Sequence, residues 1–436
     1  MKNKLLSLSE IALVGIAQYR IALAGIVLVG IALVGIAQSR IVLVRISLVW
    51  IALVGLALIP NPVQAENAIS APFNLVAASE DLELSNAFHP DARFAGADGA
   101  CSIPLDEKST VWLFGDTFVR KYASPKGQHI PTKEGMAFIN NSAAVQNIDS
   151  KTMMYSWRKN AGEPAALLIP VPASSGSNSA AYYWPGDGFV LDEKLFILNK
   201  VIVPKKSDGK NPNNLNFDWV ADDLSCVRNA GAEPSQWKYS STRLQAGSTQ
   251  IHIGTASLLK DDYVYFYTSI KSKVTPTHPH PTGVARVPVK VLLEGLRPEK
   301  FEFWNGDAWG HDYSKSAILF ADGASEMTVT ELDGEPYLVA TYMPPLSSQI
   351  CMRFSKRPEG PWSEPIKVFE CPEARIKVLG RPCSVYSAKA HPEFAKAKDE
   401  VVVSYCSNPG DFAQFQARPD LYYPHIVRIR LDHVSR

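Results

Sequence analysis

The chain of 436 residues carries 44 Lys and Arg against 43 Asp and Glu, so its net charge is +1, and 46% of its residues are hydrophobic. A near-neutral chain without a basic domain argues against a dedicated nucleic-acid binder, whose affinity comes from neutralising phosphates. The hydrophobic fraction is too high for wholesale disorder. The length is sufficient for one large domain or two.

Residues 11–60 are a tandem repeat of apolar pentads such as Ile-Ala-Leu-Val-Gly. A period of five matches neither the helix nor the strand, so the repeat has no amphipathic face. After Arg45, an apolar run at 46–60 leads to Val63-Gln64-Ala65. A basic residue, an apolar run and a small-residue end are typical of a secretory signal peptide, and we expect cleavage after Ala65. An uncleaved membrane anchor is the alternative, because the apolar stretch 21–38 is also long enough to cross a bilayer.

The leader hides the charge of the rest of the chain. Residues 1–65 contain five basic residues and one acidic residue, so residues 66–436 have a net charge of −3. We expect a leader at 1–65, an N-terminal extension at 66–84 and a single body at 85–436. The body is expected to be an exported monomer, periplasmic or extracellular, that binds no nucleic acid and meets the membrane only through an uncleaved leader.

Six cysteines follow the leader: Cys101, Cys226, Cys351, Cys371, Cys383 and Cys406. Export makes disulfides chemically possible, but the sequence does not choose between the pairings, and in a chain of this length the thiols need not be paired. No Cys-x-x-Cys pair is present, which argues against a zinc ribbon or a thioredoxin-type site.

The pattern of the body is all-β, because short β-branched and aromatic runs alternate with polar turns. Five strand–turn–strand units have turns that begin at residues 105, 191, 260, 332 and 396. Hairpins repeated at this spacing predict a five-bladed β-propeller with enlarged loops, in which both faces of each sheet are buried. A pair of β-sandwich domains is the alternative. Brief helices are expected at 289–296 and 392–398, and a loop between the first two blades at 172–180.

Acidic or imidazole side chains recur just before or after these turns. In a propeller the first strand of each blade lines the central channel, so such side chains would converge there. Hydrolysis of a glycosidic bond needs one protonated carboxyl group and one ionised carboxylate, and burial and mutual repulsion can separate their pKa values. The side chains in question are those of Asp98, Asp116, Asp187, His252, Glu326 and His391.

Several short motifs occur in order along the body: Phe114-Gly115-Asp116-Thr117-Phe118, Asn140-Asn141-Ser142, Ser325-Glu326-Met327, Gly360-Pro361-Trp362-Ser363, His391-Pro392-Glu393 and Tyr423-Pro424. In these the sequence resembles a bacterial family of five-bladed propellers, formerly a domain of unknown function, that includes endo-acting D-arabinanases. The family is similar in fold to furanosidase-type propellers such as arabinanases, xylosidases and invertases. The resemblance spans residues 85–427. It implies a glycoside hydrolase that favours furanoside linkages, while the particular glycan does not transfer.

The resemblance also implies roles for particular residues. Asp98 and Asp116 form the acidic pair, Glu326 is a third acid across the channel, and Asp187 orients or tunes the acid. The sequence does not divide the acid and base roles between Asp98 and Asp116, nor does it decide between inversion and retention. Trp184, beside Asp187, is the best platform for stacking a sugar ring. Further candidates for substrate binding are Asn141, His391 and Arg353, and related propellers can hold a channel cation, such as calcium, through a histidine.

Each assignment has a structural alternative. Aspartates beside glycine commonly form turns, which applies to Asp98, Asp116 and Asp187. His391 could instead be held by Glu393 or a backbone carbonyl, and Arg353 could form an ordinary ion pair. A non-catalytic propeller that binds glycans or an envelope partner is therefore the competing function. An esterase is disfavoured because the chain has no Gly-x-Ser-x-Gly motif and no clear metal cluster.

Overall fold

The computed structural model describes residues 69–88, 91–123, 132–170, 181–205, 216–244, 251–270 and 280–434. The chain divides into two compact units, Met1–Pro62 and Val63–Arg436, and the described residues all belong to the second. The leader, its expected cleavage point and the loop expected at 172–180 lie outside the described residues. No helix in the described ranges is long and apolar enough to span a membrane.

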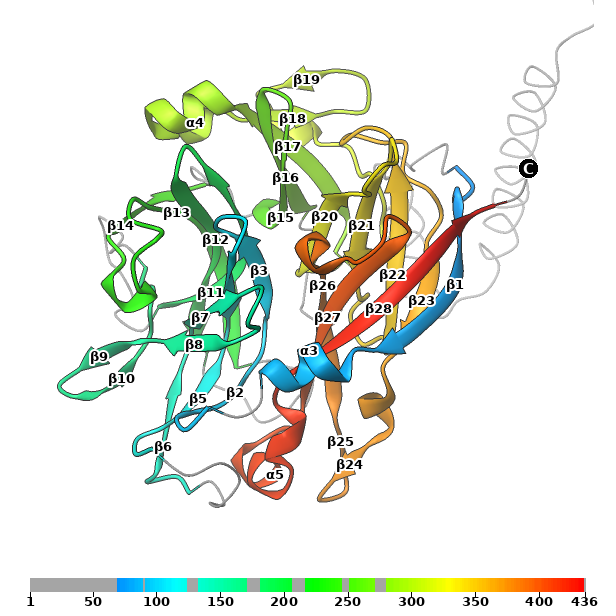
Figure 1. The fold of residues 1–436 in the computed structure, drawn as a ribbon. Coiled ribbons are helices and arrows are strands. Elements are labelled where there is room, and N and C mark those ends of the chain that lie inside the picture. Colours follow the sequence, from blue (N-terminus) through cyan, green and yellow to red (C-terminus); the bar gives the residue numbers. More distant parts are fainter. Residues whose placement is uncertain are drawn as a thin grey trace, which may run out of the picture. The chain divides into compact units, whose positions relative to one another are not determined.

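The described strands form five antiparallel sheets of four or five strands, numbered here in chain order (Figure 1). The first sheet holds β3 (Cys101–Pro104), β4 (Ser109–Phe114), β7 (Ser142–Asn147) and β8 (Met153–Ser156). The second holds β11 (Tyr182–Leu191), β12 (Lys194–Pro204), β13 (Phe217–Val227) and β14 (Tyr239–Arg243). The third holds β15 (Ile251–Lys260), β16 (Tyr263–Ile270), β17 (Thr282–Pro288), β18 (Glu302–Trp304) and β19 (Trp309–Gly310).

The fourth sheet holds β20 (Met327–Glu331), β21 (Leu338–Tyr342), β22 (Gln349–Ser355) and β23 (Ile366–Glu370). The fifth holds β26 (Ser384–Ala390), β27 (Glu400–Asn408), β28 (Pro424–His433) and β1 (Phe73–Glu80). The extension expected at 66–84 thus contributes β1, which pairs with β28 and completes the fifth sheet.

Smaller elements connect these sheets. Three short sheets are formed by β2 (Phe94–Ala97) with β5 (Thr117–Arg120) and β6 (Met136–Ile139), by β9 (Arg158–Asn160) with β10 (Glu163–Ala165), and by β24 (Lys377–Val378) with β25 (Arg381–Pro382). The helices are α3 (Leu82–Ala87), α4 (Val289–Gly295) and α5 (Phe412–Ala417). Single 3₁₀ turns lie at Pro234–Gln236, Pro298–Lys300, Tyr313–Lys315, Pro372–Arg375, Pro392–Phe394 and Pro419–Leu421.

The five predicted hairpins are confirmed, because the first two strands of every sheet pair antiparallel across the predicted turns. The helix predicted at 289–296 is α4. The helix predicted at 392–398 is wrong: only a 3₁₀ turn forms there, in which the Phe394 amide donates to the carbonyl of His391. The backbone becomes extended at Ala395, with a ψ of 136°, and the Lys396 amide donates to the Glu400 carboxylate at 2.7 Å instead of to a backbone carbonyl.

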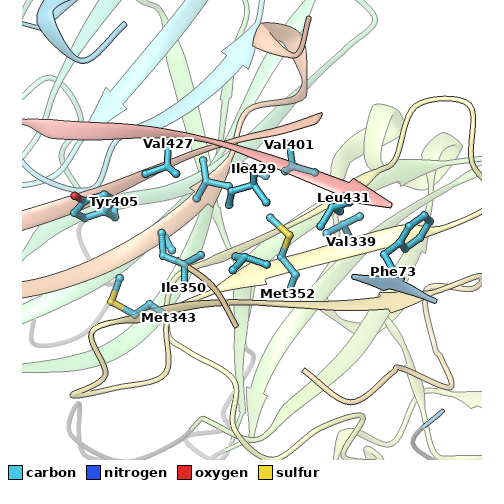
Figure 2. Close-up of a cluster of buried hydrophobic side chains, with 14 of the residues drawn as sticks. Phe73, Val339, Met343, Ile350, Met352, Val401, Tyr405, Val427, Ile429 and Leu431 are labelled. Carbon is cyan, nitrogen blue, oxygen red and sulfur yellow. The ribbon is translucent and has the colours of Figure 1, made fainter. Parts of the chain in front are cut away.

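The hydrophobic core consists of clusters between successive sheets. One cluster packs the fourth sheet against the fifth, where Ile350 and Met352 of β22 meet Val401 and Ile429 of β27 and β28 (Figure 2). Equivalent clusters join the first sheet to the second, the second to the third, and the third to the fourth.

A further cluster packs the first sheet against the fifth, so the packing of the five sheets is cyclic. It joins Trp112 and Phe114 of the first sheet to Val402 and Ile426 of the fifth. Val401 and Val402 are neighbours in β27 and face different sheets, since side chains alternate along a strand. The strands are therefore apolar on both faces, as predicted, and each sheet packs on two neighbours rather than on one as in a β-sandwich.

Candidate active site

The first strands of three sheets are bulged at a similar point. The pairing register shifts between Pro185 and Asp187 in β11, between Ile253 and Ala256 in β15, and between Tyr386 and Lys389 in β26. A bulge adds a residue to one strand and redirects the side chains around it. In β26 the bulge includes Ser387 with a φ of 60°, a conformation that is costly for a non-glycine residue and that is found most often at functional sites.

Asp98 lies between β2 and β3, Asp116 lies between β4 and β5, and backbone hydrogen bonds hold the two segments together. The Asp98 amide donates to the Asp116 carbonyl at 3.2 Å, and the Gly115 amide donates to the Asp98 carbonyl at 2.8 Å. A Cβ atom on Gly115 would lie 2.5 Å from Oδ1 of Asp98. Glycine is therefore required here so that the backbone can approach the carboxyl group. The structure brings together the two aspartates that the sequence paired.

The Asp98 carboxyl group accepts hydrogen bonds from two tyrosines. Oη of Tyr386 lies 2.7 Å and Oη of Tyr422 lies 3.1 Å from Oδ2 of Asp98. Burial and, next, the charge of Asp116 raise the pKa of Asp98 to about 8, while the tyrosine hydroxyls act in the opposite direction. Asp98 therefore tends to keep its proton at neutral pH.

Asp116 accepts from an indole and an amide. Nε1 of Trp184 lies 2.9 Å and Nδ2 of Asn140 lies 3.2 Å from its Oδ1. Burial raises the pKa of Asp116 to about 6, and these two donors limit the rise. The Trp184 ring is half-buried and contacts Phe217 edge-on at 4.6 Å. An aromatic surface thus borders the acidic pair.

Glu326 precedes β20 in the fourth sheet and is close enough for its charge to act on Asp98. Its Oε1 lies 3.4 Å from Nζ of Lys200, which β12 supplies. Burial alone would raise the pKa of Glu326, but the ammonium groups of Lys200 and Lys389 outweigh burial and lower it. Three half-buried carboxyl groups therefore share one region, and Glu326 favours the ionised form where Asp98 favours the protonated form.

Asp187 has a different environment. Its Oδ2 accepts from the amide and the hydroxyl of Ser257 at 2.6 and 3.0 Å, and its Oδ1 lies 3.6 Å from Sγ of Cys101. The Lys389 side chain, which is fully buried, donates to the carbonyls of Gly99, at 3.4 Å, and Gly186. These contacts tie the first, second, third and fifth sheets together, so Asp187 is placed to support the site rather than to reach a substrate.

Three sequence candidates are held by contacts inside the protein. Asn141 is fully buried, and its amide bonds to the backbone of Leu168 and Tyr183. Both ring nitrogens of His391 bond to hydroxyls, Ser102 at 2.6 Å and Ser404 at 2.7 Å.

Arg353 is also engaged. It donates to Oη of Tyr342 at 2.8 Å, to the Ser363 carbonyl at 2.6 Å and to Oδ1 of Asp322 at 2.7 Å. Asn141, His391 and Arg353 are therefore all bonded within the protein, and the substrate contacts expected of them stay predictions.

The sequence did not single out four other side chains that touch the acids: Asn140, Lys200, Tyr386 and Tyr422. Asn140 could have been a candidate, since it belongs to the Asn140-Asn141-Ser142 motif, but nothing in the sequence says which of the two asparagines faces the acids. Lys200 lies inside an apolar strand, where a polar residue that interrupts a buried run was the available signal. Tyr386 lies in the more exposed half of β26 and gave no such signal.

A channel cation held by His391 does not fit these residues. The imidazole has no free nitrogen, and it is buried beside the Lys389 ammonium group, whose charge together with burial lowers the pKa of His391 to about 3. Within the described part of the chain, no group of three or more His, Cys, Asp or Glu side chains could hold a metal ion. All six cysteines are described, and each is a free thiol.

The fold is shared with a protein whose structure has been solved. A ring of antiparallel sheets of this kind is also found in a candidate hydrolase from Bacteroides ovatus, which is 19% identical, with 81% of this chain and 90% of that chain covered and a TM-score of 0.62. This similarity concerns the fold alone. None of the curated proteins matches the chain.

The chain belongs to the family described as "Domain of unknown function (DUF5005)", whose model matches residues 81–431. This confirms the family membership indicated by the motifs. More distant structures include a GH43_1 enzyme from Xanthomonas citri (12% identity, 84% and 91% coverage, TM-score 0.38) and the catalytic domain of a GH62 α-L-arabinofuranosidase from Coprinopsis cinerea (9%, 83% and 97%, 0.40). These two similarities are too low to support conclusions about this chain.

Proposed function

We propose that the protein is a glycoside hydrolase whose catalytic groups are Asp98, Asp116 and Glu326. The observation that carries the proposal is the convergence of these carboxyl groups, with Asp98 inclined to hold a proton and Glu326 inclined to be ionised. Cleavage of a glycosidic bond requires this pairing of an acid and a carboxylate. The Bacteroides ovatus protein that shares the fold is likewise described as a candidate hydrolase.

Each group has a defined role in this proposal. Asp98 donates its proton to the leaving glycosidic oxygen as the bond to the anomeric carbon breaks. Glu326 supplies the carboxylate. It either takes a proton from the water that attacks the anomeric carbon, or attacks that carbon itself to form a glycosyl ester that water then hydrolyses, with Asp98 taking the proton of that water. Asp116 stays ionised beside Asp98, where its charge raises the pKa of the acid and stabilises positive charge on the sugar ring.

The five sheets are, in this proposal, the blades of a five-bladed β-propeller, and the acids line its channel. The support is the cyclic order of the core clusters and the contacts between the first strands of consecutive sheets from the first to the fifth: β3 with β11, β11 with β15, β15 with β20, and β20 with β26. Trp184 and Phe217 provide a surface on which a sugar ring can stack. The substrate is proposed to be a polysaccharide or glycoconjugate with furanoside linkages, which rests on the resemblance of the motifs.

Export is part of the proposal and rests on the leader sequence. We propose cleavage near Ala65 and a monomeric product outside the cytoplasmic membrane. N-terminal sequencing of the protein purified from culture medium and cell fractions tests the cleavage. An intact leader in the membrane fraction would show an anchor instead.

The activity is tested by reducing-sugar release from arabinans, xylans and fructans, by the wild type and by Asp98→Asn and Asp116→Asn. We expect release from at least one polymer and a loss of at least about 100-fold in either variant. Asp106→Asn is the matched control. Asp106 is an exposed turn residue just after β3, and its side-chain oxygen accepts a hydrogen bond from the Lys108 amide, which the side-chain oxygen of asparagine can also accept. Equal activity of Asp116→Asn and wild type would remove Asp116 from the mechanism. Binding of a polymer without release would favour the non-catalytic glycan-binding module.

A further inference from the structure

His280 is a buried imidazole with one nitrogen left over. Its Nδ1 lies 2.9 Å from Oγ of Ser269, while Nε2 has no hydrogen-bond partner among the described residues. The side chain is only 2% exposed. Buried polar atoms are almost always paired, so an unpaired nitrogen points to a missing partner.

The surroundings of Nε2 are polar and close to the proposed catalytic acids. Burial, then the neighbouring His252 and Lys200, lower the pKa of His280 to about 4, and Glu326 acts in the opposite direction. The imidazole is therefore neutral near pH 7. Trp219 lies beside these groups. Its ring stacks on His252 with centroids 3.8 Å apart, and its centroid lies 6.4 Å from that of His280. Nζ of Lys200 lies 5.6 Å from the centroid of the Trp219 ring. We call His280, His252, Lys200, Glu326 and Trp219 the His280 cluster.

Backbone contacts hold the loop that leads to Glu326 against His280. The His280 amide donates to the Gly323 carbonyl at 3.0 Å, which fixes the loop that leads to Glu326. A Cβ atom on Gly323 would lie 2.6 Å from the His280 carbonyl oxygen and closer still to Oγ1 of Thr282. Only glycine fits at position 323, so backbone packing fixes the distance between the His280 cluster and the proposed catalytic carboxylate of Glu326.

The charges of the His280 cluster indicate which kind of ligand it could bind. The Lys200 ammonium is balanced by Glu326 at 3.4 Å, and the carboxylate of Asp222 is occupied by His252 and by Nε1 of Trp219, at 3.0 and 2.8 Å. A metal ion would be repelled by the ammonium group, and an anion by the carboxylates. A hydroxyl group fits, because it can donate to one neighbour and accept from another.

We propose that the His280 cluster is a recognition subsite for a neutral sugar ring, whose hydroxyl groups bond to Nε2 of His280 and Nζ of Lys200. This rests on the proposed function for its choice of ligand class. The ring lies against the indole of Trp219, which offers an apolar face to the C–H groups of a sugar. Hydroxyls bound here place the ring next to Glu326 and give the enzyme a means of selecting sugars by the position of their hydroxyl groups.

Binding is measured in the full chain carrying Asp98→Asn, so that turnover does not obscure it. Calorimetry and tryptophan fluorescence follow the binding of oligosaccharides from arabinan, xylan and fructan and of arabinose, xylose and fructose, together with deoxy analogues of whichever monosaccharide binds. We expect His280→Phe to weaken the best ligand by about 3- to 10-fold, the value of one hydrogen bond. The analogue that lacks the recognised hydroxyl should bind equally to both proteins.

His311→Phe is the matched control, because His311 is exposed and its ring bonds to the Phe301 carbonyl in the outer part of the third sheet. Should His280→Phe fail to fold, His280→Gln and Lys200→Gln are measured instead, and each should weaken the same ligand. Unchanged affinity in the folded variants would overturn the subsite even if the enzyme hydrolyses glycans. Displacement of the sugar by calcium or inorganic phosphate would overturn the ligand class. Sugar binding that depends on His280 in a protein that hydrolyses nothing would uphold the subsite and reject the hydrolase.

Discussion

Oη of Tyr386 donates a 2.7 Å hydrogen bond to Oδ2 of Asp98, and both residues lie at irregular points of their strands, a bulge in β26 and the loop after β2. The tyrosine comes from the fifth sheet and the aspartate from the first. The closure of the ring of sheets therefore determines the environment of the proposed acid. Any change in that closure should be seen in the pH dependence of activity.

Replacing Tyr386 with phenylalanine should shift the alkaline limb of the pH profile upward. The hydroxyl stabilises the ionised form of Asp98, so its loss raises a pKa that already lies at about 8. A hydrogen bond to a charged group is worth about 1.5–3 kcal/mol, which corresponds to a shift of about one to two pH units in kcat/KM. A limb that stays in place would show that the acid is another group.

Replacing Asp98 with asparagine should make the protein more stable at neutral pH. The folded protein holds the proton of Asp98 up to a pH of about 8, whereas the unfolded chain releases it near 4. The unfolded state therefore binds fewer protons across this range, and the contribution of Asp98 to stability falls as the pH rises.

The variant lacks this penalty, so thermal unfolding should show a Tm higher by roughly 2–4 °C at pH 7.5 and no gain at pH 4. Asp106→Asn serves as the control, because that carboxylate is exposed and its pKa is lowered by the hydroxyl of Ser109 and the amide of Lys108. A gain that is the same at both pH values would exclude the ionisation of Asp98 as its cause.

The sequence predicted the strands and hairpins well because they depend on local patterns. The turns before Lys194 and Tyr263 and the apolar strands around them carry their information within about ten residues. The role of β1 was not predictable in the same way. Its pairing with β28 joins the two ends of the described body, and no local pattern specifies a partner so distant in the chain.

The candidate site was predicted in part for a related reason. From the residues alone the two aspartates could equally be turn formers, and Asp98, Asp116 and Glu326 were identified through the resemblance to a known family. Their partners were not, since Lys200 and Tyr386 reach the acids only through the stacking of different sheets. Asn141 and Arg353 carry the residue types of a binding site, and only burial and contacts show what they bond.

Replacing Arg353 with lysine should lower stability rather than substrate affinity. The guanidinium group makes three hydrogen bonds in a fork that an ammonium group cannot reproduce. We expect a loss of about 2–3 kcal/mol in the free energy of unfolding by urea, with KM unchanged. Arg381→Lys is the control, because its ion pair with Asp411 is exposed and should change stability by less than about 0.5 kcal/mol. A raised KM at unchanged stability would instead support the role in substrate binding predicted from the sequence.

Adjacent asparagines should give opposite results when each is replaced by alanine. Asn140 donates to Oδ1 of Asp116, so Asn140→Ala should raise the pKa of Asp116 and move the acidic limb of kcat/KM up by about half a pH unit to one unit, with little change in Tm. Asn141→Ala removes three buried hydrogen bonds and should cost about 2–3 kcal/mol of stability, while the pH profile of the remaining folded enzyme stays the same. Measuring both variants by urea unfolding and by kinetics from pH 4.5 to 8.5 tests the assignment, because a shifted profile in Asn141→Ala alone would mean that the two side chains have exchanged roles.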